Sequence, residues 1–237
     1  MKTILITGAN KGIGFETAWQ LAQLGHFVYI GSRDIEKGRR AVERLMAKGF
    51  DNVAAIELDV TKPESIQKAK MELESKAGAL DVLINNAGIS GPRQQNLMDI
   101  DMDDLRSVFD TNFFGVVQTT QRLLPLLRKS TAASIINVSS EIGSLQMNTV
   151  PGRPQNFHAY GSTKTALNAF TVMLANELKN YNICVNSVTP GFTATDLNQH
   201  QGTKTPEEGA KPIVALANLT DRSITGKFFK EGSEVPW

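Results

Sequence analysis

The chain has 237 residues, of which 41% are hydrophobic, so it can bury the core of one large domain. Its formal net charge of +1 gives no reason to expect a nucleic acid or an anionic membrane surface as a partner. The single cysteine, Cys184, excludes an internal disulfide and lies in an apolar run, where we expect a core residue. No apolar run in the sequence approaches membrane-spanning length, and we expect a soluble, cytoplasmic protein.

A glycine-rich turn follows the first apolar run of the chain, residues 4–6. Residues 7–14 read TGANKGIG, and apolar residues at helical spacing begin directly after them. A strand, a glycine turn and a helix in this order form the context of a phosphate-binding loop, because the helix N-terminus offers free N–H groups to an anion. We predict that a dinucleotide binds here, although a glycine-rich turn without a ligand would have the same spacing.

The end of the second predicted strand, residues 27–30, indicates which dinucleotide the chain prefers. An NAD site has a carboxylate here for the ribose 2′-hydroxyl, whereas an NADP site has cations for the 2′-phosphate. Ser32 stands at the position of the acid, Arg33 follows it, and Lys11 can approach the same phosphate. We predict NADP (NADPH), with Asp34 as the cap of the next helix and a merely solvated Arg33 as the alternative.

Polar residues also follow the third and fourth predicted strands, residues 53–58 and 82–84. Asp59 could accept a hydrogen bond from the adenine amino group, and capping of the next turn is the alternative. The small residues in 85–88, NNAG, would let a cofactor ribose pass close to the backbone. An asparagine-rich turn without a ligand is again the alternative.

A long helix is predicted from Asp103 to about Lys129, and it contains Asn112 among apolar residues. A buried asparagine is costly unless its amide is hydrogen-bonded, so we expect Asn112 to shift the local helical hydrogen bonds and to bind water. The fifth predicted strand, 134–138, ends in two serines. Ser140, the second of them, could cap the next turn or hold a substrate oxygen.

Tyr160 and Lys164 lie four residues apart at the start of another predicted helix, and therefore on one face of it. We expect the ammonium group to lower the pKa of the phenol, which could then give and take a proton near the working pH. The same spacing also occurs by chance, as an aromatic ring packed beside a snorkelling lysine.

The sixth predicted strand, 183–188, is followed by a polar stretch, and we interpret residues 189–206 as a substrate-side lid loop. A helix at 206–219 and a last strand at 226–229 complete the chain. Strands and helices alternate throughout, so we predict one Rossmann-type doubly wound α/β domain over residues 1–237. Its sheet would have about seven parallel strands with helices on both faces.

Taken in this order, these motifs resemble the short-chain dehydrogenase/reductase family, in particular its compact NADP-dependent carbonyl reductases. The resemblance implies that Tyr160 is the general acid or base and that Lys164 holds the nicotinamide ribose. It also implies that Ser140 orients the substrate oxygen and that Asn112 supports a water linked to Lys164. Ser140 is preferred over its neighbour because Gly143 follows it at the family's usual offset.

The predicted cofactor contacts come from the glycine turn, the ends of the strands and the segment after the sixth strand. No metal ligands are predicted. Besides Tyr160 and Lys164, the cofactor contacts are Gly8, Asn10, Lys11, Gly12, Ile13, Gly14, Arg33, Asp59, Val60, Asn86, Ala87, Gly88, Pro190, Gly191, Phe192, Thr193 and Thr195.

One departure from the family pattern is the segment 144–158, which makes the interval between Ser140 and Tyr160 longer than in most members. Large monomeric carbonyl reductases carry a much longer insertion there, which covers the helices that relatives use to dimerise. We therefore expect free helices and a homodimer or homotetramer. An apolar substrate site is predicted, with an inert insert as the alternative. Its lining residues are Ser140, Met147, Phe157, Phe192 and Leu197.

The leading functional interpretation is reversible, NADPH-dependent reduction of an aldehyde or ketone, so the expected partner is a small carbonyl compound. One alternative is a 3-oxoacyl thioester reductase, which would need a basic entrance for a phosphopantetheine carrier. Another is a non-catalytic NADPH-sensing regulator, which would have no need of the proton path through Tyr160, Lys164, Ser140 and Asn112. We expect neither a nucleic acid nor a membrane as partner.

Overall fold

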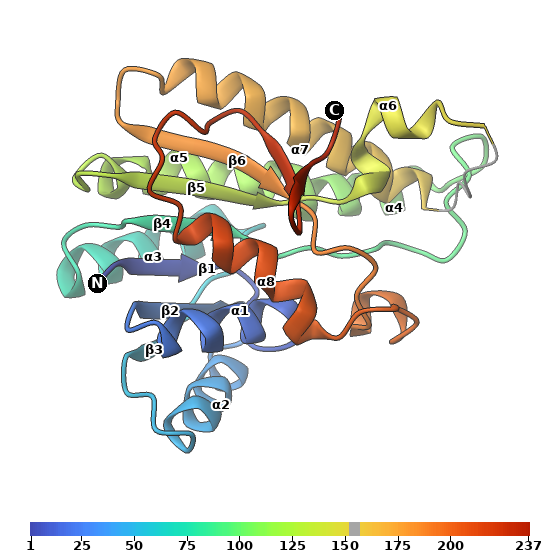
Figure 1. Ribbon diagram of the computed structural model, residues 1–237. Coiled ribbons are helices and arrows are strands. Elements are labelled where there is room, and N and C mark those ends of the chain that lie inside the picture. The colour runs from blue at the N-terminus through green and yellow to red at the C-terminus, as the bar shows by residue number, and fades with distance from the viewer. Residues whose placement is uncertain (152–156) are drawn as a thin grey trace.

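An eight-stranded sheet forms the centre of the computed structural model, which describes residues 1–151 and 157–237 (Figure 1). The strand order is β3-β2-β1-β4-β5-β6-β7-β8, and neighbours are parallel except for the antiparallel pair β7 and β8. The strands are β1 (Thr3–Ile6), β2 (Phe27–Ser32), β3 (Val53–Glu57), β4 (Val82–Asn85), β5 (Ala133–Val138), β6 (Ile183–Val188), β7 (Phe228–Lys230) and β8 (Ser233–Glu234).

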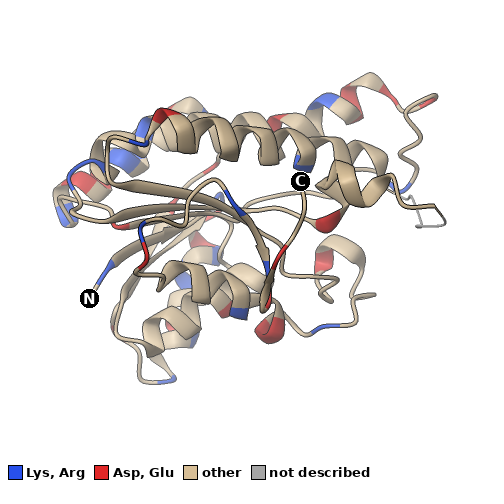
Figure 2. Ribbon diagram, turned by 45° about the horizontal axis from the view of Figure 1, so that its top comes forward, with Lys and Arg blue, Asp and Glu red and all other residues tan. Residues whose placement is uncertain are grey.

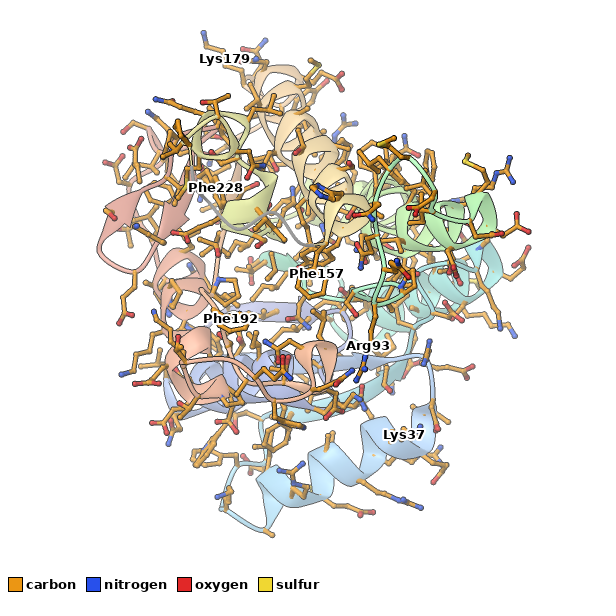
Figure 3. The ribbon with its side chains drawn as sticks, turned by 90° about the vertical axis from the view of Figure 1, so that its right-hand side faces the viewer. Lys37, Arg93, Phe157, Lys179, Phe192 and Phe228 are labelled. Carbon is orange, nitrogen blue, oxygen red and sulfur yellow. The ribbon has the colours of Figure 1, made fainter. Side chains whose placement is uncertain are left out.

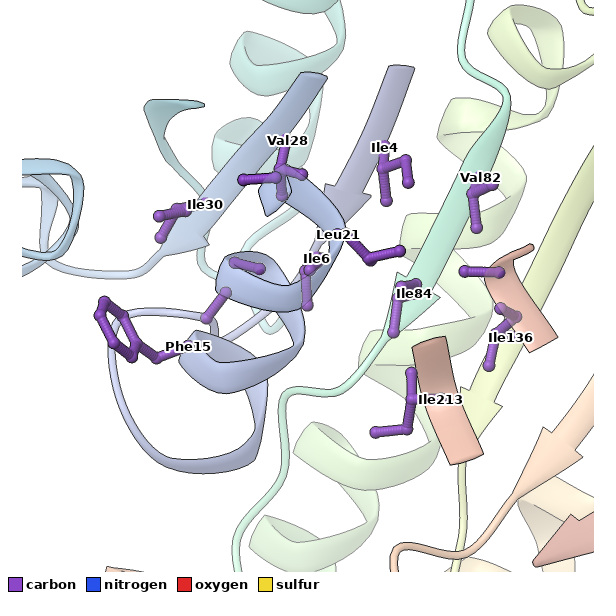
Figure 4. Packing of buried hydrophobic residues seen from close by; sticks show 14 of the residues in the cluster. Ile4, Ile6, Phe15, Leu21, Val28, Ile30, Val82, Ile84, Ile136 and Ile213 are labelled. Carbon is purple, nitrogen blue, oxygen red and sulfur yellow. The ribbon is translucent and has the colours of Figure 1, made fainter. Parts of the chain in front are cut away.

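Helices cover both faces of the sheet, so the strands are buried on both sides, as the apolar runs predict. One face packs against α1, α2 and α8, and the other packs against α3, α5 and α7. On the first face, Leu21 of α1 and Ile213 of α8 contact the core that includes Ile4 and Ile84 (Figure 4). The long helices are α1 (Gly12–Gln23), α2 (Ile35–Met46), α3 (Pro63–Lys76), α4 (Met102–Phe109), α5 (Gly115–Leu127), α7 (His158–Glu177) and α8 (Pro206–Ala217).

The strand order places a topological switch point between β1 and β4. The chain runs from β1 outward to β2 and β3 and then crosses back to β4 on the other side of β1. A crevice outside the carboxyl ends of the strands forms where the order reverses, and open α/β sheets bind ligands there. This topology confirms the predicted Rossmann-type fold, and seven of the eight strands in the described part of the chain are parallel.

The helix expected between Asp103 and Lys129 is interrupted. α4 ends at Phe109, a π-helical turn, η1 (Asp110–Phe114), follows, and α5 begins at Gly115. Asn112 lies inside η1 with no solvent exposure, and its amide bonds to the backbone of Ile89. In a π-helical turn the backbone hydrogen bonds join residues five apart instead of four. The expected local shift in helical hydrogen bonding around Asn112 is therefore confirmed.

The sequence analysis does not predict β8 or the short helix α6 (Leu145–Asn148), which lies within the insert. The C-terminal tail holds α6, since Ser144 Oγ donates to the Pro236 carbonyl (2.6 Å) and the Gln146 N–H donates to the Trp237 carbonyl (2.8 Å).

Cys184 is buried, as expected. Within residues 1–151 and 157–237, no helix is long and apolar enough to cross a bilayer. Basic and acidic residues are interspersed over the elements (Figure 2).

Candidate functional site

The glycine turn after β1 is packed so closely that two of its glycines, Gly8 and Gly14, leave no room for side chains. A Cβ on Gly14 would lie 2.5 Å from Asn86 Nδ2, and one on Gly8, which has φ +63°, would lie 2.9 Å from Ala87 Cα. The Asn86 amide donates to the carbonyls of Thr7 (2.8 Å) and Gly8 (3.1 Å). The turns after β1 and β4 are therefore joined at the switch point.

The first turn of α1 offers donors to an anion. Lys11 is its N-cap residue and makes no side-chain cap, so the first N–H groups of α1, which begins at Gly12, have no side-chain acceptor at the cap. Asn10 and Ile13 are half-buried beside these groups. Backbone N–H groups at a helix N-terminus, next to glycines that allow close approach, fit a pyrophosphate.

The end of β2 has no carboxylate free to accept from a ribose. Ser32 is buried and its hydroxyl donates to the Asp34 carbonyl (2.7 Å). Asp34 caps α2 by accepting from the N–H groups of Glu36 and Lys37, and these bonds, chiefly that from Lys37, lower the pKa of its carboxyl group. The predicted capping role of Asp34 is confirmed, and Arg33 is the exposed side chain at this corner.

Asp59, after β3, takes the capping role that the sequence left open. Its Oδ1 accepts from the N–H (3.0 Å) and the hydroxyl (2.7 Å) of Thr61. Val60 is buried, and its carbonyl accepts a hydrogen bond from the Gln118 amide of α5. These bonds fix the turn after β3, while a contact between Asp59 or Val60 and the adenine stays a prediction.

Asn112 is tied into the loop after β4 and into α7. Its Oδ1 accepts from the Ile89 N–H (2.9 Å), and its Nδ2 donates to the Ile89 carbonyl (2.9 Å) and to Thr163 Oγ1 (3.2 Å). A Cβ on Gly88 would lie 3.2 Å from Asn112 Oδ1 and 3.9 Å from Lys164 Nζ. Gly88 therefore allows the loop to pass between these two candidate catalytic groups.

The two serines after β5 have different environments. Ser139 is 2% exposed and donates to Asn168 Oδ1 of α7 (2.7 Å), so its hydroxyl is engaged in the core. Ser140 is half-buried and caps the 3₁₀ turn η2 (Glu141–Gly143), at 3.4 Å from the Ile142 N–H. Ser140 is thus the serine that remains accessible, which agrees with the choice made from the sequence.

Gly143 allows η2 to pack directly on the helix that carries Tyr160 and Lys164. A Cβ on Gly143 would lie 2.7 Å from both the carbonyl carbon and the Cβ of Lys164. Gly161 opposes the same turn, since its own Cβ would lie 3.2 Å from the Ile142 carbonyl oxygen. The close packing that these two glycines allow brings Ser140 to the N-terminal part of α7.

Tyr160 and Lys164 lie in the first two turns of α7, with Lys164 buried and Tyr160 partly buried. Lys164 is 4% exposed, its Nζ donates to the Val138 carbonyl (2.8 Å), and it lies 5.4 Å from the centre of the Tyr160 ring. Burial lowers the pKa of Lys164 to about 8 and raises the pKa of Tyr160. The expected lowering of the Tyr160 pKa is therefore wrong for this structure, because burial outweighs the attraction of an ammonium group that is bonded to Val138.

The loop after β6 reaches back to the glycine turn. Asp196, at the start of the 3₁₀ turn η3 (Asp196–Asn198), forms an ion pair with Lys11 and lies 2.8 Å from His200 Nε2. A Cβ on Gly12 would lie 3.6 Å from Thr195 Cγ2. The predicted cofactor residue Lys11 therefore already has a partner in the predicted lid.

The remaining predicted cofactor residues lie at the start of this loop. Pro190 directly follows buried Thr189, and Gly191 adopts φ +79°. Thr193 is buried, and its hydroxyl lies 3.2 Å from the Gly191 carbonyl oxygen. The loop is thus a tight, internally bonded turn at the carboxyl end of β6.

Apart from Ser140, the predicted substrate residues that the structure describes are apolar side chains, and each is at least partly exposed. Met147 is half-buried in α6, and the exposed fractions of Phe157, Phe192 and Leu197 are 38%, 54% and 39%. Phe157 and Phe192 lie between the α7 region and the α1 region (Figure 3). Residues 152–156 of the insert lie outside the described part of the chain, and a role of the insert in substrate binding stays a prediction.

Three residues that support the site are not predicted from the sequence. Thr7 Oγ1 accepts from the N–H groups of Asn86 (3.0 Å) and Ala87 (2.9 Å), and Thr163 Oγ1 donates to the Tyr160 carbonyl (2.7 Å). Gln95 bonds to the Tyr160 N–H (2.9 Å). Thr7 lies within the glycine turn and Thr163 lies between Tyr160 and Lys164, whereas no sequence motif contains Gln95. The described residues contain no group of three or more His, Cys, Asp or Glu able to hold a metal.

Two comparisons of sequence give matches that extend over most of the chain. The family model described as short chain dehydrogenase matches residues 2–206. Short-chain dehydrogenase anuI of Penicillium roqueforti is 38% identical over 222 residues, which cover 90% of this chain and 87% of that protein. The 3-oxoacyl-[acyl-carrier-protein] reductase FabG of Staphylococcus aureus is 36% identical over 232 residues, covering 96% of this chain and 89% of that protein.

A comparison of structures gives the same result. The NADPH-bound carbonyl reductase from chicken fatty liver superposes with a TM-score of 0.88 at 28% sequence identity. The match covers 100% of this chain and 99% of that chain. The similarity therefore extends over the sheet, the helices and all the segments that carry the candidate site.

Proposed function

Because the chain belongs to the short-chain dehydrogenase family, we propose that it reduces an aldehyde or ketone to an alcohol with NADPH, by reversible hydride transfer. The observation that carries this proposal is the arrangement of Ser140, Tyr160, Lys164 and Asn112. The turn that follows Ser140 packs on α7 at Gly143, and the Asn112 amide donates a hydrogen bond to Thr163 of α7. A complete set of this kind favours an enzyme over a non-catalytic NADPH sensor, which would not need a proton path.

The residues present fit NADPH. The glycine turn and the uncapped start of α1 would hold the pyrophosphate, and the turn after β4 would meet the nicotinamide ribose. NADPH supplies the hydride when it is bound. Lys164 would hold the ribose hydroxyls, a role for which its buried amine is already placed beside Gly88.

Tyr160 would supply the proton. A raised pKa keeps its hydroxyl protonated at neutral pH, so the group is ready to act as an acid in the reductive direction. The raised pKa does not prevent transfer, because an alkoxide is a stronger base than a phenolate. Ser140 would donate to the substrate oxygen as negative charge develops on it, which stabilises the transition state more than the substrate.

NADP is proposed over NAD because of the corner at Ser32 and Arg33. Ser32 stands where an NAD site has its carboxylate, and Arg33 is exposed and able to reach a 2′-phosphate. The Asp34 carboxylate, one residue later, accepts from the first N–H groups of α2. The carbonyl reductase from chicken fatty liver is an NADPH-bound protein of the same fold.

Replacing Arg33 with alanine is expected to weaken NADPH binding about tenfold, because a charge-assisted contact to the 2′-phosphate is lost. NADH binding should be unchanged, since NADH lacks that phosphate. Titration calorimetry with both cofactors measures the effect, and Arg39→Ala, an exposed arginine on the next helical turn, is the control. Equal losses for NADPH and NADH would contradict the assignment of Arg33.

The proposed substrate is an uncharged, apolar carbonyl compound. Phe157, Phe192 and Leu197 offer apolar surface on the proposed substrate side. The lysines of the predicted lid region are paired, Lys11 with Asp196 and Lys204 with Glu231 (2.9 Å), which leaves less positive charge for an acidic carrier. The similarity to FabG keeps a 3-oxoacyl thioester as the second candidate.

The loss of NADPH absorbance across a panel of substrates tests the proposal. The panel contains bulky apolar ketones, short aldehydes and a 3-oxoacyl thioester at equal concentration. Faster turnover of the apolar ketones supports the first candidate, and faster turnover of the thioester supports the second. NADPH binding without turnover of any of them would favour the sensor.

Exposed apolar side chains of η1 and α7 are proposed to pair two copies of the chain. Phe114 of η1 and Met173 of α7 are 54% and 65% exposed, and large apolar side chains on a surface favour association. We expect a dimer or tetramer at micromolar concentration in analytical ultracentrifugation, and the double variant Phe114→Glu, Met173→Glu should shift it towards monomer. A monomeric wild-type protein would refute the proposal.

A further inference from the structure

The loop between β4 and α4 carries a glutamine that is only 3% exposed, Gln95. A buried amide destabilises a protein unless its donors and its acceptor are bonded. Here both ends are bonded: Oε1 accepts from the Tyr160 N–H at 2.9 Å, and Nε2 donates to the carbonyls of Ser90 and Pro92, each at 2.7 Å. One side chain therefore ties two points of its own loop to the backbone of the candidate catalytic tyrosine.

The helix that carries Tyr160 does not cap itself. The N-cap residue of α7 is Phe157, which makes no side-chain cap and adopts a left-handed backbone conformation (φ 69°). The first helical hydrogen bond runs from the Gly161 N–H to the Phe157 carbonyl (2.7 Å), so the Tyr160 N–H has no acceptor within the helix. Gln95 supplies that acceptor from a segment 65 residues earlier in the chain.

The other side of the Tyr160 peptide unit is also held. The Tyr160 carbonyl accepts from Thr163 Oγ1 (2.7 Å), and that hydroxyl in turn accepts from the Asn112 amide (3.2 Å). Asn112 is bonded to Ile89, which precedes Gln95 in the same loop. The loop after β4 thus reaches Tyr160 by two routes, one through Gln95 and one through Asn112 and Thr163.

From this arrangement we propose that Gln95 is a positioning residue, which fixes Tyr160 relative to Lys164 and to the substrate oxygen by capping α7 from outside the helix. The inference rests on the proposed function, because it assigns Tyr160 as the proton donor. Small displacements of a reacting group lower a rate steeply, whereas the cofactor site on the glycine turn does not depend on this bond.

The test compares Gln95→Met, which has a similar length and no acceptor, with Gln94→Met. Gln94 is the exposed neighbour of the same type and should leave activity unchanged. In Gln95→Met we expect kcat to fall by about ten- to a hundredfold, with the dissociation constant for NADPH unchanged. NADPH binding stoichiometry counts the folded molecules, so a mere loss of folded protein would not produce this result.

Two further measurements separate positioning from packing. Hydrogen exchange of the Tyr160 amide should be roughly tenfold faster in Gln95→Met, because its acceptor is lost. Gln95→Glu keeps an acceptor for the Tyr160 N–H at a helix N-terminus but loses the donor to the Ser90 and Pro92 carbonyls, so it should retain the protection of the Tyr160 amide while the stability of the protein falls. If Gln95→Met does not fold, Gln95→Asn, which is too short to reach Tyr160, takes its place with the same expectations.

A kcat within twofold of wild type in folded Gln95→Met would overturn the proposal, and so would a Tyr160 amide that exchanges no faster in Gln95→Met than in the wild-type protein. The proposed function fails separately, if the wild-type protein turns over no carbonyl compound. Even then, the exchange rate of the Tyr160 amide would show whether Gln95 caps the helix.

Discussion

Replacing Tyr160 with phenylalanine is expected to lower the rate of NADPH-dependent carbonyl reduction by about 10²–10⁴-fold. The substitution removes only the hydroxyl and leaves the ring, whose centre lies 5.4 Å from Lys164 Nζ, in place on α7. The backbone bonds from Gln95 and from Thr163 do not involve the side chain, so the helix should stay in position. Initial rates with the best substrate of the panel measure the effect.

NADPH binding should be nearly unchanged in this variant, because the glycine turn and the start of α1 lie on other elements. Tyr181→Phe is the matched control, since Tyr181 is 49% exposed and its ring packs beneath Arg128 at the surface. Turnover of Tyr160→Phe at a near wild-type rate would defeat the assigned mechanism. Loss of both turnover and cofactor binding would instead indicate a folding defect, which thermal unfolding would detect.

Most of the fold follows from local patterns in the sequence. β6 has the predicted bounds, and each other parallel strand begins or ends within two residues of its predicted limits, because an apolar run between turn residues is a local signal. The chain order of the strands and helices then fixes the switch point, and the switch point fixes where the strand ends meet. This explains why residues as distant as Gly8, Ser140 and Tyr160 were assigned to one site.

Side-chain environments were less predictable, because they depend on contacts between distant segments. The π-turn at Asn112 requires Ile89 and Thr163 as partners, and neither follows from helical periodicity. Gln95 is one of two adjacent glutamines in an irregular loop, and only the position of α7 decides which is buried. The pairing of Lys11 with Asp196 likewise links the glycine turn to a segment 185 residues later.

The direction of the Tyr160 pKa shift was wrong for a related reason. Helical spacing gives the separation of Tyr160 and Lys164, but it does not give the burial of either group. Lys164 Nζ is bonded to the Val138 carbonyl at the end of β5, and burial disfavours the phenolate of Tyr160 and the ammonium of Lys164 alike. A charged lysine with one backbone carbonyl as its bonded partner is therefore a source of instability at the candidate site.

Replacing Lys164 with methionine is expected to inactivate the enzyme and at the same time to stabilise the fold at neutral pH. The drop in the Lys164 pKa from 10.5 to about 8 corresponds to about 3 kcal/mol of destabilisation while the amine is charged. Methionine has a similar length and no charge, but it gives up the bond to the Val138 carbonyl, which stabilises by about 1 kcal/mol. The free energy of unfolding at pH 7 should therefore rise by about 2 kcal/mol.

The difference in stability between Lys164→Met and the wild-type protein should depend on pH in a definite direction. Between pH 8 and 10.5 the unfolded chain binds more protons at Lys164 than the folded chain does, so wild-type stability from this group increases with pH. The advantage of Lys164→Met should accordingly be full below pH 8, shrink above it, and reverse near pH 10.5 as the wild-type amine becomes neutral in both states. Urea unfolding of both proteins across this range measures the difference.

Lys179→Met, at an exposed lysine just beyond the end of the same helix, is the control and should show no such dependence. A Lys164→Met variant that is less stable than wild type by the same amount at every pH would contradict the burial argument. Turnover should fall by about 10²-fold or more in the same variant, because it lacks the group that we propose to hold the ribose beside the proposed proton donor. Higher stability together with lost activity would show that the chain retains a buried charge at a cost in stability because the reaction requires it.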